Sequence, residues 1–335
     1  MEKNVHYLET HSQNPYYNLA FEEYVLYHRT EGDYLLLWQN DNTIVVGQNQ
    51  NTEAEINRAF VEEHHINVVR RGTGGGAVYH DLGNLNYSFI TDIGDDGVSI
   101  RRFTEPVVAA LRSLGLNAEA SGRNDILVEG RKVSGTAQRL HNGRILHHGT
   151  LLFDANPGMV AGALNVDPEK FRSKSTKSVR ARIGNIRDFL PVDMELPAFW
   201  TYLKETLSGG GLTADALTAD ELAADELAAV ERLKTEKYDT WQWNYGRSPK
   251  FDVTHKRYWD GGALEANLSI ANGVITDGRF YGDFLAVRGM DTLVERLKGV
   301  EFRPEAVRAV LEDCPVDELF GGITIDEVMS TIFGL

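Results

Sequence analysis

The chain has 335 residues, 34 of them Lys or Arg and 49 Asp or Glu, so its formal net charge is −15. Its hydrophobic content of 42% excludes a disordered chain, its length allows two domains, and its acidity argues against broad nucleic-acid binding, which depends on neutralising phosphates. No apolar run or N-terminal stretch is typical of a membrane span or a secretory signal, and a single cysteine, Cys314, excludes an internal disulfide, so we expect a soluble cytoplasmic protein.

The first elements predicted along the chain are helices and short strands. Asn14-Pro15 has the pattern of a helix start, and we expect a helix to about His28. Strands are predicted at 34–38, 43–46, 66–70 and 77–79, and the capping-box spacing of Thr52 and Glu55 predicts a helix from 52 to about 64. Residues 84–90 alternate apolar and polar side chains, which is typical of a half-buried strand.

A helix at 106–114 and two consecutive hairpins follow. The first hairpin joins 126–128 to 131–134, and the second joins 136–140 to 144–153 through Asn142-Gly143, a strong hairpin signal. Consecutive hairpins predict an α+β fold with antiparallel or mixed sheets rather than a doubly wound parallel sheet. The near-repeat at 213–227 is interpreted as a surface helix.

The remaining segments predict a second, smaller unit. An aromatic-rich junction at 237–246 is followed by two strands around Asn272-Gly273 and by helices near 291–298, 304–311 and 326–332. We therefore predict domains at 1–246 and 247–335, the second being a small α+β unit.

The densest chemical signal is the segment 70–81, RRGTGGGAVYHD. Consecutive glycines let several backbone N–H groups point at one anion, and Arg71 adds a charge beside them, so we expect phosphate or carboxylate binding here. The alternative is a plain connection between strands. A dinucleotide fingerprint is rejected because a strand, not a helix, is predicted to follow the glycines, and no P-loop motif occurs.

Two further segments carry candidate side chains. Lys132, early in the return strand of a hairpin, is predicted to share a face with Ser134 while Val133 takes the other, and it offers a fixed positive charge. Most strand lysines are simply exposed, and that alternative stays open. The adjacent His147 and His148 are predicted to point to opposite faces, which excludes joint chelation of a metal.

A basic segment interrupts the acidic chain. Residues 170–187 contain seven Lys or Arg and no acidic residue. Such a run is usually a solvated face, and the alternative is a basic loop that closes over a phosphate or docks an acidic partner.

Taken together, these segments resemble the lipoate–protein ligase A family. The matching blocks are RRGTGGGAVYHDLGN at 70–84, SGRNDI at 121–126, RKVSGTAQ at 131–138, HHGTLL at 147–152, SVRARIGNI at 178–186 and WQWNYG at 241–246. Thr73 stands where the family often has serine. The resemblance implies a large α+β domain related to biotin protein ligases, with a small C-terminal accessory domain.

The resemblance also implies a reaction and its partners. The carboxylate of free lipoate, or of octanoate, attacks the α-phosphate of ATP, with Mg2+ expected beside the ATP, to give an acyl-adenylate and pyrophosphate. A lysine amine on a lipoyl domain of a 2-oxoacid dehydrogenase or glycine cleavage protein then displaces AMP. An acyl-adenylate hydrolyses, so both steps need water excluded.

Site roles follow from the same resemblance. The catalytic residue is Lys132, which contacts the lipoate carboxylate and the α-phosphate. The residues implied for ATP and adenylate are Arg71, Gly74, Gly75, Gly76, Ala77, Val78, Tyr79, Asn84, Lys132, Arg180 and Arg182. Those implied for lipoate are Leu19, Glu22, Trp38, Arg71, His80, Lys132, Ala137 and His148. The metal ligand is not identified by any carboxylate cluster, and Asp125 is a candidate.

Two other functions remain open at this point. An acyl amidotransferase on the same fold would need a thiol, and Cys314 lies outside every motif. A regulator that binds lipoate or nucleotide without turnover would not need a cation such as Lys132 at the reacting bond.

Overall fold

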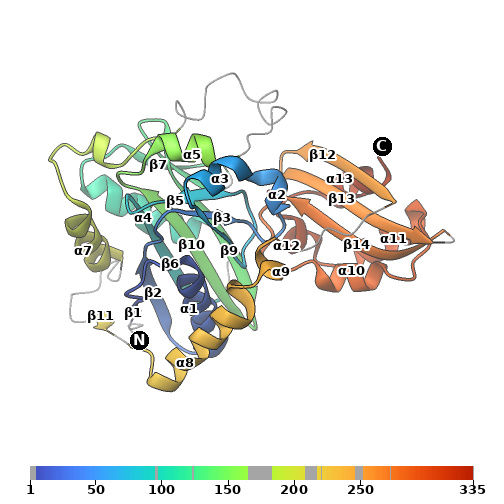
Figure 1. Ribbon diagram of the computed structural model, residues 1–335, viewed down its shortest axis with the longest axis horizontal. Coiled ribbons are helices and arrows are strands. Elements are labelled where there is room, and N and C mark those ends of the chain that lie inside the picture. Colours follow the sequence, from blue (N-terminus) through green and yellow to red (C-terminus); the bar gives the residue numbers. More distant parts are fainter. Residues whose placement is uncertain are drawn as a thin grey trace.

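One mixed sheet carries the larger part of the protein. From edge to edge its strands are β11 (Leu217–Ala219), β1 (Val5–Glu9), β2 (Asp33–Trp38), β6 (Asn84–Asp92), β10 (Arg144–Leu152), β9 (Arg131–His141), β8 (Asp125–Val128) and β7 (Ala118–Ser121). β1 is parallel to β2 and β11, and the other pairs are antiparallel. This computed structural model describes residues 5–94, 97–122, 124–164, 183–207, 217–219, 221–245, 252–271 and 273–334. The predicted α+β class is confirmed (Figure 1).

Helices cover both faces of this sheet. α4 (Arg101–Ser113) and α7 (Leu196–Leu207) pack on one face, and α1 (Pro15–His28) and α8 (Ala224–Leu233) pack on the other. The side chain of Asn14 caps α1 as predicted. The strand predicted at 84–90 is confirmed as β6, but it is not half-buried, because α1 covers its polar face and leaves Asn86 only 2% and Ser88 0% exposed. α4 begins earlier than predicted and contains Pro106.

A second, three-stranded sheet lies beside α1. Its order is β4 (Asn67–Arg70), β3 (Thr43–Val46), β5 (Val78–His80), and α2 (Thr52–Glu55), α3 (Arg58–Glu63) and α5 (Pro157–Ala163) accompany it. The single helix predicted from Thr52 is wrong: the helix breaks after Glu55. The Thr52 hydroxyl does not cap it, because it donates to the Asn244 carbonyl and accepts from Arg70.

The C-terminal part has its own sheet and hydrophobic core. The strands are β12 (Val253–Trp259), β13 (Gly262–Ala271) and β14 (Val274–Gly282), and the helices are α10 (Asp291–Leu297), α11 (Pro304–Glu312), α12 (Val316–Phe320) and α13 (Ile325–Phe333). The two strands and three helices predicted here are confirmed, whereas β12 and α12 were not predicted. None of the helices in the described ranges is both long and apolar enough to cross a bilayer.

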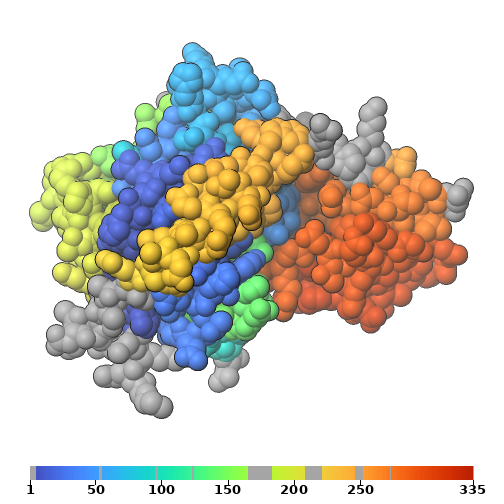
Figure 2. Space-filling view, turned by 60° about the horizontal axis from the view of Figure 1, so that its bottom comes forward, coloured from blue at the N-terminus to red at the C-terminus, as the bar shows by residue number. Residues whose placement is uncertain are grey.

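The segment between these parts differs most from the prediction. Part of the near-repeat at 213–227 lies outside the described residues, and the rest is not one helix. Leu217–Ala219 forms edge strand β11, and α8 begins only at Ala224. A π-helical turn (Lys234–Tyr238) and α9 (Trp241–Asn244) then lead toward the C-terminal part. Figure 2 shows this segment as a band lying across the α1 side of the molecule.

Candidate active site

A cavity of about 130 Å3 lies between the eight-stranded sheet and the glycine-rich segment that joins β4 to β5. We call it the slot. Its floor includes a row of paired residues: Trp38 on β2 is opposite Asn86 on β6, and Asn86 is opposite Thr150 on β10. β9, which carries Lys132, is the next strand. Three strand spacings separate β9 from β2, so the floor extends across roughly 14 Å of sheet.

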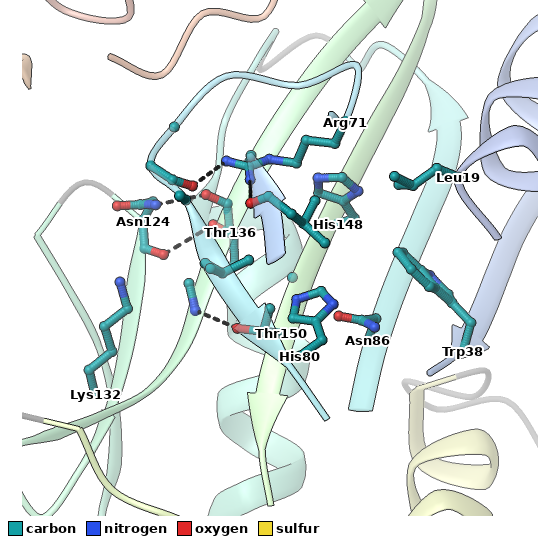
Figure 3. A pocket seen from close by; sticks show the side chains of 18 residues that line it. Leu19, Trp38, Arg71, His80, Asn86, Asn124, Lys132, Thr136, His148 and Thr150 are labelled. Carbon is teal, nitrogen blue, oxygen red and sulfur yellow. Dashed lines mark hydrogen bonds between the residues drawn. The ribbon is translucent and has the colours of Figure 1, made fainter. Parts of the chain in front are cut away.

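The opposite wall of the slot comes from elements outside this sheet. The backbone at 75–78, Val45 of β3, His80 of β5 and Leu19 of α1 all line it. In Figure 3 Lys132 lies at one end, while Leu19 and Trp38 lie at the other. The slot therefore has a cationic end and a largely apolar end.

Most of the predicted site residues meet in this slot. Those that line it are Leu19, Trp38, Arg71, Gly75, Gly76, Ala77, Val78, His80, Lys132, Ala137 and His148. They come from segments more than a hundred residues apart in the chain, and the two sheets bring them together.

A β-bulge aims Lys132 into the slot. Ile126 pairs with Ser134, but the next residue, Leu127, pairs with Lys132, so Val133 is an extra residue on β9. Consecutive residues of a strand face opposite sides, and their partners do too. The prediction that Lys132 and Ser134 share a face is therefore wrong. Ser134 is fully buried, whereas the Lys132 side chain is 40% exposed and lines the slot.

Asp125 is the ion-pair partner of Lys132. The Lys132 Nζ lies 2.7 Å from its Oδ1, across the β8–β9 hairpin. No group of three or more His, Cys, Asp or Glu in the described ranges can hold a metal ion. In this structure the Asp125 carboxylate pairs with an ammonium, and its role as a Mg2+ ligand stays a prediction.

The glycine-rich segment is held by a buried arginine rather than left open. The Arg71 guanidinium donates to the carbonyls of Gly74 (2.6 Å), Gly76 (2.8 Å) and Val45 (3.2 Å). Burial lowers the pKa of Arg71 to about 10, which still leaves it charged at neutral pH. Arg71 thus supports the segment from behind. Its charge lies beside the slot, and no carboxylate of the described residues is bonded to it.

Two of the glycine N–H groups expected to bind an anion are occupied. Gly74 donates to the Ala286 carbonyl at 3.2 Å, and Gly75 donates to the Phe284 carbonyl at 3.0 Å. Both acceptors lie in the loop that follows β14. A Cβ on Gly74 would come within 2.6 Å of Ala286 N. In this arrangement the C-terminal part rests on the glycines, and Gly74 does not line the slot.

A buried chain of hydrogen bonds connects α1 to the glycine segment through His148. The Nδ1 of His148 lies 2.9 Å from a Glu22 carboxylate oxygen, and its Nε2 lies 2.8 Å from the Thr73 hydroxyl. The Thr73 oxygen also accepts from Arg71 Nε at 3.0 Å. His148 therefore bridges Glu22 and Thr73 through its two ring nitrogens. Glu22 does not line the slot, but it orients the histidine that does.

The other predicted residues lie elsewhere. Tyr79 packs in the core of the small sheet and donates its hydroxyl to Asn42. Asn84 is buried behind the slot and donates to Asn86. Arg180 and Arg182 lie outside the described residues.

At the described end of the predicted basic loop 170–187, the positive charge is balanced by neighbouring carboxylates. Arg187 forms ion pairs with Asp154, Asp193 and Glu195. Ile183 forms a bridge with Lys132, so the segment rejoins the fold directly beside the cationic end of the slot.

Several polar residues that line the slot were not predicted from the sequence. Asn86, Asn124, Thr136 and Thr150 all line the slot. The signal for Asn86 was present in the alternation at 84–90, because a polar face that a helix covers becomes the inside of a pocket. His147, on the opposite face from His148 as predicted, is fully buried and stacks on Phe103.

Cys314 lies far from this chemistry. It packs against the hydrophobic core of the C-terminal part and does not line the slot.

Both parts of the chain match family models of lipoate protein ligases. Residues 14–208 match the family model of the lipoyl protein ligase A/B catalytic domain, and residues 248–332 match that of the bacterial lipoate protein ligase C-terminus. The lipoate–protein ligase LplJ of Bacillus subtilis is 43% identical over 322 residues, which cover 96% of this chain and 97% of LplJ.

Two solved structures show the extent of the structural similarity. LipL1 of P. falciparum, solved with lipoate, superposes with a TM-score of 0.77 and 25% identity, covering 99% of each chain. A lipoate–protein ligase A bound with ATP gives a TM-score of 0.63 at 29% identity and covers 73% of this chain and 99% of its own.

Proposed function

The chain belongs to the lipoate–protein ligase family, and we infer from this membership that it is an ATP-dependent lipoate–protein ligase. It activates free lipoate to lipoyl-AMP and transfers the lipoyl group to a lysine of a lipoyl domain. The observation that supports this most is the slot itself, which has an ammonium at one end and apolar side chains at the other. An amphiphilic carboxylic acid matches both ends.

We assign the first step to the Lys132 end of the slot. The lipoate carboxylate attacks the α-phosphorus of ATP, a P–O bond forms, and pyrophosphate leaves. The Lys132 ammonium would offset the negative charge that gathers on the phosphate oxygens. Its exchange of Asp125 for substrate costs little, because both side chains are about a third or more exposed.

The adenylate contacts proposed for Gly74 and Gly75 require a rearrangement. Their N–H groups bond to backbone carbonyls of the C-terminal part. A phosphate can accept from these two groups only after the carbonyls of Phe284 and Ala286 have moved away. Gly76, Ala77 and Val78 also line the slot, and the carbonyls of Phe284 and Ala286 do not have to move for a phosphate to reach them.

The second step transfers the acyl group at the same end. The neutral ε-amine of the acceptor lysine attacks the acyl carbon, AMP departs with the bonding electrons, and the amine loses one proton. Lys132 would stabilise the departing phosphate in this step as well. The open, cationic end of the slot is the side from which the acceptor lysine would arrive.

Some details remain proposals. We propose residues 1–246 as the catalytic unit and 247–335 as the accessory unit, supported by their separate hydrophobic cores. Use of octanoate, a cytoplasmic location and acceptors from 2-oxoacid dehydrogenases or glycine cleavage are likewise predicted. The described residues provide no cluster of His, Cys, Asp or Glu for Mg2+.

The test is direct. Purified protein incubated with ATP, lipoate and acceptor lipoyl domains should release pyrophosphate and add one lipoyl mass to the domains. The variant Cys314→Ser should behave like the wild type, whereas complete loss would support a thiol-dependent amidotransferase. Lipoate binding without pyrophosphate release would instead support the regulator and contradict the ligase.

A further inference from the structure

His80 presents an N–H group to the slot that has no acceptor in the described part of the chain. Its Nδ1 lies 3.2 Å from the Asn40 amide nitrogen, and the Asn40 oxygen already accepts from Asn18. Nδ1 is therefore an acceptor, and the ring proton is on Nε2. Burial and the positive charge of Arg71 lower the pKa of His80 to about 3, which keeps the ring neutral. Nε2 is buried and finds no partner among the described residues.

Asn86 adds a second donor of the same kind. It is only 2% exposed, and its Oδ1 accepts from the Asn84 amide at 3.0 Å. Its Nδ2 has no hydrogen-bond partner within the described ranges. Buried donors are nearly always paired in folded proteins, so two unpaired donors lining one pocket indicate that the pocket's contents complete them.

The two donors lie in the half of the slot remote from Lys132. Asn86 is one strand from Trp38 and two strands from the strand of Lys132, which corresponds to about 5 Å and about 10 Å of sheet. In Figure 3 His80, from the opposite wall, and Asn86, from the floor, both lie between Thr150 and Trp38, away from the Lys132 end. An eight-carbon acid with its carboxylate at Lys132 would place its distal carbons beside them.

We propose that His80 and Asn86 form a donor pair that selects acyl chains carrying a hydrogen-bond acceptor near the distal end. The pair makes the protein prefer lipoate, whose dithiolane sulfurs are weak acceptors, over octanoate, which offers none. Octanoate would displace whatever pairs the two donors and leave both unsatisfied, which is the costly outcome for a buried polar group. This proposal rests on the ligase function and names the determinant of its acyl specificity.

The first experiment compares the two acids in pyrophosphate release with ATP. The wild type should favour lipoate over octanoate by about tenfold or more in kcat/KM, the range expected for leaving a buried donor unpaired. Asn86→Leu removes one donor at similar size and should reduce that preference several-fold. Val45→Ala is the matched control, because it reshapes the slot without touching a donor and should change both acids in parallel.

A second comparison separates hydrogen bonding from the bulk of the dithiolane. The acid 5-ethoxypentanoate is octanoate with its sixth carbon replaced by oxygen, so the two differ in the acceptor and hardly in size. The wild type should use it at least as well as octanoate, and Asn86→Leu should use it less well than octanoate. Because each ratio is measured within one protein sample, partial unfolding of the variant cancels.

The outcomes distinguish the proposal from the function on which it rests. Equal use of lipoate and octanoate by the wild type would overturn the donor pair while leaving the ligase intact. A preference that Asn86→Leu leaves unchanged would also overturn it, since shape alone would then select the acid. A parallel loss with all three acids would place Asn86 at the carboxylate instead.

If no acid releases pyrophosphate, the ligase function fails, and calorimetric titration of the three acids then tests the donor pair separately. If Asn86→Leu does not fold, the wild-type ranking of the three acids decides.

Discussion

Replacing Lys132 with methionine separates a catalytic role from a structural one. Methionine keeps most of the length of the side chain and removes only its charge. The side chain is 40% exposed and pairs with an Asp125 side chain that is 34% exposed. Such solvent-exposed pairs contribute only about 0–1 kcal/mol to stability, so Lys132→Met should unfold at nearly the wild-type urea concentration.

The effect on the reaction should be far larger than the effect on stability. The ammonium is the one positive charge at that end of the slot among the residues that line it, apart from Arg71, whose guanidinium is bonded to carbonyls. Loss of one such stabilising donor costs about 3–4 kcal/mol in comparable sites, which is a factor of roughly 10^2–10^3 in rate. We therefore expect lipoate-dependent pyrophosphate release to fall by that factor.

The assay measures pyrophosphate release, and urea unfolding of the same sample, for Lys132→Met and two controls. Arg131→Met removes an exposed positive charge on the neighbouring residue of β9 and should retain activity. Asp125→Asn keeps the ammonium and should retain most activity, whereas a large loss would indicate that the carboxylate binds Mg2+ after all. Turnover of Lys132→Met close to that of the wild type, with fold and lipoate binding intact, would refute the role assigned to the ammonium.

Three further outcomes follow from the packing and the titrating groups. Glu22→Gln removes the charged acceptor of a buried hydrogen-bond chain, so urea unfolding should show a loss of about 1.5–3 kcal/mol; an unchanged midpoint would contradict the chain. Gly74→Ala would force a Cβ to 2.6 Å from backbone and should cost about 1–3 kcal/mol, whereas Gly76→Ala has 3.8 Å to its nearest neighbour and should change stability by less than about 0.5 kcal/mol in thermal unfolding. Equal effects would show that the contact is absent in solution. Burial lowers the pKa of both His80 and His147 to about 3, so the unfolded chain takes up protons that the folded chain does not, and stability should fall as the pH drops below about 6.5. Each histidine should contribute roughly 2 kcal/mol of loss between pH 6.5 and 5, and unfolding that is independent of pH over this range would contradict their neutral burial.

Local sequence signals predicted the elements that depend on neighbouring residues. Asn14-Pro15 starts α1, and Asn142-Gly143 turns β9 into β10, because a cap and a tight turn are decided by the dihedral angles of a few residues. The motif blocks likewise identified the family and most of the slot lining. The helix predicted from Thr52 starts there but stops after Glu55, where Ile56 forms a bridge with Leu164 and the Asn57 N–H donates to the Ala163 carbonyl, both from a distant segment.

The sequence by itself determined which chemical groups this protein has and which short elements carry them. Tertiary structure alone decided how those groups are used. The bulge at Val133 turns Lys132 into the slot, the loop after β14 occupies the N–H groups of two glycines, and the cover of α1 makes Asn86 a pocket residue. Each of these depends on pairing or packing between segments far apart in the chain. The residue pattern of one segment does not show which other segment it pairs with, or in which register.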